Sequence, residues 1–313
     1  MNSDNRRPGP AIPAALHDLM KQVGPIWRND VPGHVRQMAE GFSAVLAHAP
    51  KEGVVRTNDL AYGAHPRQCL DLFQPGRDME TAGAAPLLMF LHGGAFVDGE
   101  RNRSDEFYAN ILYFFARHGV LGVNLEYRRA PEFVYPSGAE DVALAVAWAR
   151  ANAARHGGDA QRIFLMAHSA GAAHAAGYAY DRRRQPASGP GIAGLIVISG
   201  RVRADNLAEN PNARKVEAYY GSDASLFEER SPVAHVDAGS VPTFVAFAEY
   251  ENPLIDLYCT ELAYRLATAQ RRAPPLLRLR GHNHTSIVAH FNTAEDFLGR
   301  EILDFIATTP PLA

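Results

Sequence analysis

Six short apolar runs alternate along this chain with stretches of helical patterning, and few folds accommodate that alternation. The runs occupy residues 86–94, 120–128, 162–169, 192–200, 241–249 and 274–282. Each has the length of a strand, and such runs are typical of strands buried on both faces of a parallel sheet. Helical patterning covers residues 137–157, 170–184 and 257–272. The pattern predicts an α/β fold with a mostly parallel central sheet and helices on both faces.

The N-terminal part of the chain is patterned differently. Residues 54–63 and 68–73 alternate like half-buried strands, and we expect them to pair as a hairpin-like opening to the sheet. Ahead of them, apolar residues recur at helical spacing between Val31 and Val45. The first ten or so residues are polar and rich in proline, which predicts a flexible tail.

The composition limits the kinds of molecule that we expect this protein to bind. The chain has 313 residues, 47% of them hydrophobic, with a formal net charge of −3 and a sequence pI of about 6.5. The apolar content suffices for a large core, and the charge gives no sign of binding to nucleic acid or to an anionic membrane. We expect a small-molecule partner; the oligomeric state stays open, with a homodimer as one option.

Cysteine usage and hydropathy predict a cytoplasmic location. Cys69 and Cys259 are isolated thiols, which do not make the disulfide framework of a secreted domain. The N-terminal residues contain no apolar core of the kind a signal peptide has. No run approaches the ~20 apolar residues of a membrane-spanning helix.

Reactive residue types stand where four of the apolar runs end. In open α/β sheets, ligands bind beside the carboxyl ends of the strands. The sequences at these ends are His-Gly-Gly at 92–94, His-Ser at 168–169, Glu-Tyr-Glu at 249–251 and Gly-His-Asn-His at 281–284. The pattern predicts one site at the carboxyl edge of the sheet.

Ser169 stands in Ala-His-Ser-Ala-Gly, where a nucleophile elbow has Gly-x-Ser-x-Gly. Ala167 and Gly171 are small enough for such a turn to close, although Ala167 replaces a glycine. Serine is also favoured as a helix N-cap, so the pentapeptide alone allows both interpretations. In an elbow, His168 would face away from the serine.

Gly93 and Gly94 follow the first of these runs. Adjacent glycines let the backbone turn so that its amide hydrogens point into a pocket, as a developing oxyanion requires. An ordinary Gly-Gly turn is the alternative. The Gly93–Gly94 pair stands two predicted strands ahead of a candidate nucleophile, and this position favours the catalytic interpretation.

A base and an acid follow later in the chain. His282 or His284 could accept the serine proton at neutral pH. Glu249, Glu251 and Asp256 lie between the serine and these histidines, in the order Ser…Asp/Glu…His of hydrolases with an elbow. Acids after a strand also cap helices, and Asp256 suits that role better than Glu251.

Taken together, these motifs resemble the α/β-hydrolase carboxylesterases, a group that includes the hormone-sensitive-lipase-like esterases and the kynurenine formamidases (arylformamidases). The resemblance is carried, in family order from about Val54 onward, by HGGAF, EYRRAPEFVYPSGAEDVALAVAW, AHSAGAAHAA, SPVAHV, AEYENPLID and GHNHTS. Ala167 departs from the elbow glycine. Ala95 stands where the lipase-like esterases often have a third glycine and the formamidases an aromatic residue.

The resemblance implies roles for individual residues. Ser169 would be the nucleophile, His284 the general base, and Glu251 would stand where the family usually has aspartate. His92 would brace the glycine loop. The backbone N–H groups of the oxyanion hole would belong to Gly93, Gly94 and Ala170.

The resemblance also implies the α/β-hydrolase fold with a small helical cap. We predict an N-terminal tail and cap helices over 1–53, a catalytic domain over 54–313, and a cap-like excursion at about 201–240, where patterning is weak and charges are many. The pocket beneath should be apolar. Candidate substrate-binding wall residues are Phe96, Trp27, Tyr219 and Tyr220.

The predicted function is that of a serine hydrolase that cleaves carboxylic esters of short or medium acyl chains through an acyl-enzyme. The many charges in the excursion at about 201–240 argue against a lipase that acts on long acyl chains. An arylformamidase or amidase acting on N-formylkynurenine-like substrates is one alternative, and a non-catalytic ligand-binding protein of the same fold is another. No cofactor or metal is expected, since His282 and His284 alone are too few ligands for zinc.

Overall fold

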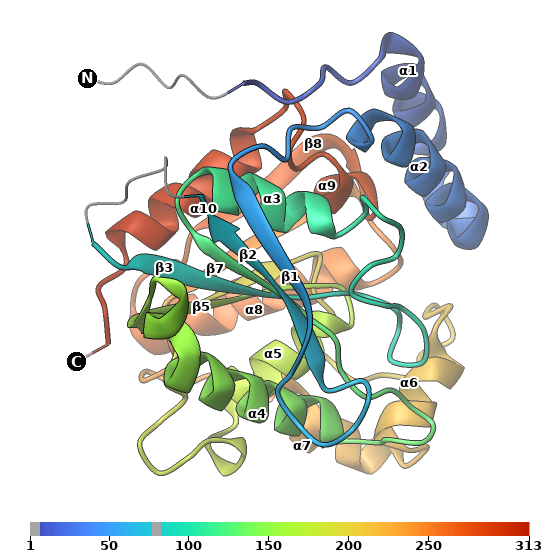
Figure 1. Ribbon diagram of the computed structural model, residues 1–313. Helices are drawn as coiled ribbons and strands as arrows, with labels where there is room; N and C mark the ends of the chain where they lie inside the picture. The colour runs from blue at the N-terminus through green and yellow to red at the C-terminus, as the bar shows by residue number, and fades with distance from the viewer. Residues whose placement is uncertain (1–6, 77–82, 313) are drawn as a thin grey trace.

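The computed structural model describes residues 7–76 and 83–312, and its centre is one eight-stranded sheet (Figure 1). The strand order is β1-β2-β4-β3-β5-β6-β7-β8. β2 is antiparallel to both neighbours, whereas the six strands from β4 to β8 in this order are parallel. The strands are β1 (Val54–Ala61), β2 (Cys69–Pro75), β3 (Ala85–Leu91), β4 (Leu121–Leu125), β5 (Gly158–His168), β6 (Gly194–Ile198), β7 (Thr243–Tyr250) and β8 (Leu276–Asn283). The predicted parallel sheet and its antiparallel opening are confirmed.

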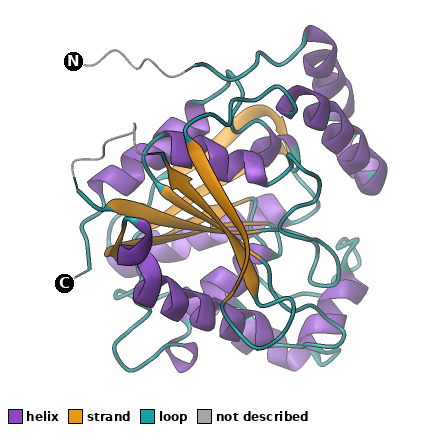
Figure 2. Ribbon diagram, in the orientation of Figure 1, coloured by secondary structure: helices purple, strands orange, loops and turns teal. Residues whose placement is uncertain are grey.

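Helices cover both faces of the sheet, as Figure 2 shows. One face carries α3 (Ala109–Arg117), α9 (Ser286–Ala289) and α10 (Phe297–Thr308); the other carries α4 (Ser137–Asn152), α5 (Gly171–Tyr180) and α8 (Ile255–Gln270). Side chains of β3 alternate between the two cores. Leu88 and Phe90 join the first, and Leu87, Met89 and Leu91 join the second. Burial on both faces explains why the central strands read as continuous apolar runs.

The N-terminal segment adds α1 (Ala14–Val23), the 3₁₀ turn η1 (Trp27–Asn29) and α2 (Val31–Leu46). The helix predicted from Val31 onward is confirmed, and Asp30 caps it by accepting the Gly33 N–H at 3.0 Å. α1 packs on α2 and on β8, and α2 packs on α9. Of the predicted tail, residues 1–6 lie outside the described residues.

The positions of α1 and α3 were not predicted. α1 begins only a few residues after the expected tail, and its proline N-cap makes no side-chain hydrogen bond that would mark the start. α3 is buried along most of its length, including Ile111, Leu112 and Phe115. α3 has only nine residues, and in so short an apolar run a helical pattern is hard to tell from that of a buried strand.

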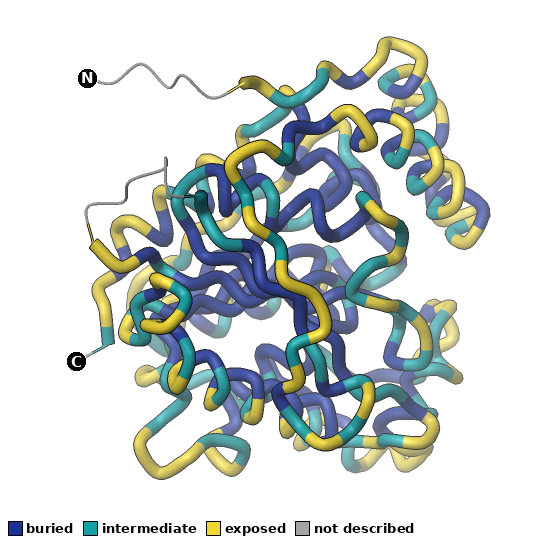
Figure 3. Tube along the Cα trace, in the orientation of Figure 1, coloured by how far each residue is buried: buried dark blue, intermediate teal, exposed yellow. Residues whose placement is uncertain are grey.

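The stretch at about 201–240 leaves the sheet between β6 and β7 and contains α6 (Ala213–Tyr220), α7 (Phe227–Arg230) and the 3₁₀ turns η4 (Ala224–Leu226) and η5 (Pro232–His235). In Figure 1, α6 and the pair α1 and α2 lie on opposite sides of the end of the sheet toward which β3 runs. Figure 3 shows dark, buried strands between these more exposed segments. Within 7–76 and 83–312, no helix has the length and apolar character needed to span a bilayer.

Candidate active site

Four loops meet at the carboxyl edge of the sheet, and each carries predicted site residues. Gly93 and Gly94 follow β3, and Ser169 follows β5. Glu251 follows β7 directly, and His284 follows β8 directly. Because these strands are parallel, their carboxyl ends lie at one edge, and residues far apart in sequence become neighbours.

Ser169 occupies a strained turn between β5 and α5. Its φ of 55° is in the left-handed region, which non-glycine residues seldom adopt. The turn is held at both ends: the Ser169 N–H donates to Ile198 at 3.2 Å, and its carbonyl accepts from the Arg201 N–H at 2.9 Å. A Cβ on Gly171 would lie 2.4 Å from the carbonyl oxygen of His92, so this position requires glycine. The local geometry is that of a nucleophile elbow.

His284 lies between the serine and a carboxylate. Its Nε2 is 3.0 Å from Ser169 Oγ, and its Nδ1–H donates to Glu251 Oε2 at 2.5 Å. Glu251 is buried, and its other oxygen accepts from the Ala248 N–H at 2.7 Å and from the Ser199 hydroxyl. The carboxylate therefore holds the proton on Nδ1 and leaves the Nε2 lone pair facing the serine, which is the tautomer that a general base needs.

The alternatives that the sequence left open have other partners. Glu249 accepts from the Gly281 N–H at 2.8 Å. Asp256 lies in the first turn of α8 and forms an ion pair with Arg28 at 3.1 Å. His282 contacts Ser286, and burial together with the charge of His290 lowers its pKa to about 3. Glu251 and His284 are thus the acid and the histidine that the fold brings to Ser169.

The glycine loop packs directly against the serine. A Cβ on Gly93 would lie 2.9 Å from Ser169 Cβ, and Gly94 has a φ of 146°, which suits only glycine. The Gly93 N–H also reaches the hydroxyl of Tyr108; burial raises the pKa of this tyrosine, and the contacts from Arg103 and from Gly93 partly offset the rise. Ala170 follows the serine and is buried. Gly93 thus lies against Ser169, and Ala170 adjoins it in the chain, whereas Gly94 packs against Asp98 and Gly99. The role of these three residues as oxyanion donors stays a prediction.

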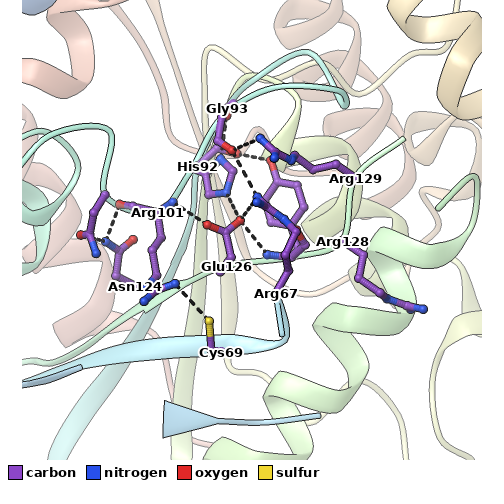
Figure 4. Close-up of polar contacts among 12 residues, drawn as sticks. Arg67, Cys69, His92, Gly93, Arg101, Asn124, Glu126, Arg128 and Arg129 are labelled. Atoms are coloured by element: carbon purple, nitrogen blue, oxygen red, sulfur yellow. Dashed lines mark hydrogen bonds and ion pairs between the residues drawn. The ribbon is translucent and has the colours of Figure 1, made fainter. Parts of the chain in front are cut away.

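A buried polar network holds this loop from behind (Figure 4). His92 Nδ1 lies 2.7 Å from the Gly93 carbonyl, and His92 Nε2 lies 2.9 Å from Glu126 Oε1. Arg67 also binds this carboxylate, and the Arg101 N–H donates to its second oxygen at 3.1 Å. Burial by itself raises the pKa of Glu126, but the hydrogen bond and charge of His92, together with Arg67 and the Arg101 amide, hold it below its ordinary value.

Sequence reasoning placed His92 as a brace but missed Glu126. The acid lies just after β4, in the segment that begins Glu-Tyr-Arg-Arg, and that motif was its only sequence signal. A buried carboxylate that binds one histidine and one arginine orients the loop it supports, and it does so without touching the reacting atoms.

A cavity of about 450 Å³ borders the glycine loop. Its lining is largely polar, because it includes charged residues of the 98–108 segment, and it contains neither Ser169 nor His284. The apolar pocket that the sequence leads us to expect stays a prediction. The lining residues are Gly93, Gly94, Asp98, Gly99, Glu100, Arg103, Tyr108 and Arg129.

The four aromatic residues proposed as pocket walls lie elsewhere. Phe96, Tyr219 and Tyr220 form a buried cluster in which Phe96 stacks on Tyr219 at a centroid distance of 4.8 Å. Trp27 is buried under the loop after β7, where its indole N–H donates to Asn252 at 2.8 Å. None of the four is among the residues that line the cavity beside Gly93. Their role as substrate contacts stays a prediction.

Sequence comparisons find esterases. Esterase LipC of Mycobacterium tuberculosis is 28% identical over 246 residues, which cover 74% of this chain and 60% of that protein. Esterase LipQ of the same organism is 28% identical over 229 residues, 67% of this chain and 53% of that protein. The chain thus spans little more than half the length of these relatives.

Solved structures share the fold. A bacterial heroin esterase superposes with a TM-score of 0.69 at 23% identity, covering 90% of this chain and 93% of that one. Phosphonate-inhibited esterase B from Lactobacillus rhamnosis gives 0.68 at 17% identity, covering 93% and 95%. The family model described as BD-FAE matches residues 70–258, more than half of the chain. The chain therefore belongs to the BD-FAE family and has the α/β-hydrolase fold of the carboxylesterases.

Proposed function

We propose that this protein is a serine hydrolase that cleaves carboxylic esters through an acyl-enzyme, with Ser169, His284 and Glu251 as its triad. The observation that carries the proposal is the hydrogen-bonded chain from Ser169 Oγ through His284 to Glu251, with distances of 3.0 and 2.5 Å. The esterase names of the relatives support the reaction class.

The first half of the reaction forms the acyl-enzyme. His284 Nε2 takes the hydroxyl proton as Ser169 Oγ attacks the ester carbonyl carbon, and Glu251 stabilises the imidazolium that results. Gly93, Gly94 and Ala170 donate backbone N–H groups to the oxyanion. The tetrahedral intermediate collapses when His284 gives its proton to the departing alcohol.

The second half releases the acid. Water takes the place of the alcohol, and His284 removes its proton as the oxygen attacks the acyl carbonyl. Collapse of this second intermediate breaks the bond to Ser169 Oγ and returns the proton to it. Every proton moves among Ser169, His284, the departing alcohol and water, so the proton transfers balance over the cycle.

The acyl group that we propose is short or medium in length. The cavity of about 450 Å³ beside Gly93 and Gly94 is at the small end of the usual range for ligand sites, and its walls are polar. A long alkyl chain would leave these charged side chains desolvated without partners, which costs free energy.

The experiment that tests the proposal is hydrolysis of p-nitrophenyl acetate and butyrate by the wild-type protein and by Ser169→Ala. We expect kcat to fall at least ~10³-fold in the variant and a phosphonate to label the wild type at Ser169. Ser188→Ala, on the exposed loop after η3 (Arg182–Arg184), is the matched control. Wild-type turnover in Ser169→Ala would refute the proposal. N-formylkynurenine and simple amides, tested in parallel, decide between esterase and formamidase activity.

A second experiment tests the assignment of Glu251 as the acid of the triad. Glu251→Gln keeps the size of the side chain but removes its charge, so we expect kcat to fall by ~10³–10⁴-fold. Asp256→Asn, which alters a nearby acid in the first turn of α8 that is paired with Arg28, should change kcat by less than about threefold, as for a surface ion pair. A larger loss in Asp256→Asn than in Glu251→Gln would overturn the assignment of the acid.

A further inference from the structure

His168, the residue before the elbow serine, contacts the loop that carries the catalytic histidine. Its Nε2 lies 2.9 Å from the carbonyl oxygen of His284, and the two imidazole rings are 4.7 Å apart at their centroids. The sequence places His168 at an elbow position that faces away from the serine. In the structure it reaches across to a residue 116 positions later.

The protonation of His168 follows from its surroundings. Burial and the nearby charge of His284 hold the pKa of His168 well below its ordinary value, so the ring is neutral near pH 7. A carbonyl oxygen only accepts, so the single ring proton is on Nε2 and donates to His284. The other nitrogen, Nδ1, is buried and has no hydrogen-bond partner within residues 7–76 and 83–312. The ring therefore offers this carbonyl a donor at all pH values at which the enzyme would work.

The backbone of His284 has two hydrogen bonds that fix it to its neighbours. Its N–H donates to the Tyr250 carbonyl at 3.0 Å, which ties it to the end of β7. Its carbonyl accepts from His168, which ties it to the elbow itself. The first bond sets the distance between His284 and the acid loop. The second sets the distance between His284 and Ser169, two residues 115 positions apart in the chain.

We propose that His168 is a positioning residue that fastens the His284 loop to the elbow and so keeps His284 Nε2 within reach of Ser169 Oγ. This inference rests on the proposed function, because it assigns His168 a role in the same reaction. His168 acts through the His284 backbone and touches neither the substrate nor the reacting atoms. Its loss should lower kcat more than it raises KM, since the misplacement affects the proton transfer and leaves the substrate contacts in place.

The test compares His168→Gln, His168→Asn and His168→Leu on p-nitrophenyl butyrate. A glutamine amide can donate from near the position of His168 Nε2, whereas an asparagine amide ends near Nδ1 and is too short, and leucine has no donor. We expect His168→Gln to keep kcat within about threefold, and the other two variants to lose ~10–100-fold with KM within about twofold. The Gln and Asn pair keeps the test decisive if the leucine variant does not fold.

A double-mutant cycle separates positioning from damage to the fold. In a His284→Ala background no general base remains to be positioned, so adding His168→Asn should leave the residual rate unchanged. His174→Leu serves as the matched control, because His174 is also buried but neither ring nitrogen has a hydrogen-bond partner in the described parts of the chain. We expect this control to keep kcat within about threefold.

Three results would overturn the inference: equal kcat values for the Gln and Asn variants, wild-type kcat in His168→Leu, or a further loss when His168→Asn is added to His284→Ala. Each would leave ester hydrolysis by the wild type intact. Absence of hydrolysis by the wild-type protein, in contrast, would refute the proposed function itself, so the two failures are distinguishable.

Discussion

The loop after β3 and the loop after β7 lie on opposite sides of β5 in the sheet order, and they are held in place by different parts of the chain. The glycine loop is held by a buried network within the sheet domain, in which Glu126 binds His92 and Arg67. The acid loop is held in part by the N-terminal segment. Trp27 donates to Asn252, and Arg28 donates to the carbonyl of Glu251 at 3.3 Å.

The two loops should respond differently when the residues that hold them are substituted. Glu126 is a buried charge with several partners, so its loss leaves uncompensated charges in the core. Trp27 contributes one neutral hydrogen bond and the packing of its ring to a loop that also has hydrogen bonds of its own to the sheet. Outside the proposed triad, substitutions of the residues that hold the glycine loop should therefore lower kcat more than substitutions of the residues that hold the acid loop.

Among substitutions of the residues that hold the two loops, the largest effect is expected for Glu126→Gln. The glutamine cannot balance His92 and Arg67, so the glycine loop should lose its fixed orientation. Because loss of one oxyanion donor costs ~10²–10³-fold in kcat, we expect kcat to fall by ~30–100-fold in steady-state assays. Glu140→Gln, a change of the same kind at a half-exposed site beside Arg128, should keep kcat within about twofold. Equal effects of the two substitutions would contradict the role given to the network.

A smaller effect is expected for Trp27→Phe. The substitution removes the N–H that binds buried Asn252, and an unsatisfied buried acceptor costs about 1–3 kcal/mol of stability. We expect a lower Tm and a fall in kcat of about 3–10-fold, because Asn252 adjoins Glu251. Trp148→Phe, on α4 away from the loop, is the control and should keep kcat. If Trp27→Phe lowered kcat more than Glu126→Gln, the comparison between the two loops would be reversed.

The smallest effect is expected in the pH dependence of the Tm of Glu126→Gln compared with wild type. The folded-state pKa of Glu126 is lowered, so its contribution to stability is complete above the unfolded carboxyl value of about 4.3 and is lost as the pH falls through the lower folded value. Tm measured against pH should show wild type above Glu126→Gln near pH 7. The gap should narrow below about pH 4. A gap that stays constant down to pH 2 would show that the charge of Glu126 does not stabilise the fold.

Much of the fold could be predicted because it depends on local patterns. Continuous apolar runs mark strands that are buried on both faces, and β3, β5 and β6 follow that rule. The order of motifs also predicted that Ser169, Glu251 and His284 stand at strand ends. The packing of Phe96 on Tyr219 could not be predicted, because it depends on which elements pack over the sheet edge.

The sequence by itself determined the α/β architecture and a short set of residues able to do acyl-transfer chemistry, since both follow from residue type and spacing along the chain. Location in the cell and oligomeric state stay predictions. Only the tertiary structure decided which acid meets the histidine, and that His168 reaches its backbone. Those contacts join loops 33 and 116 residues apart. Whether residues so far apart in the sequence come into contact depends on strand order and loop packing, which no local sequence pattern specifies.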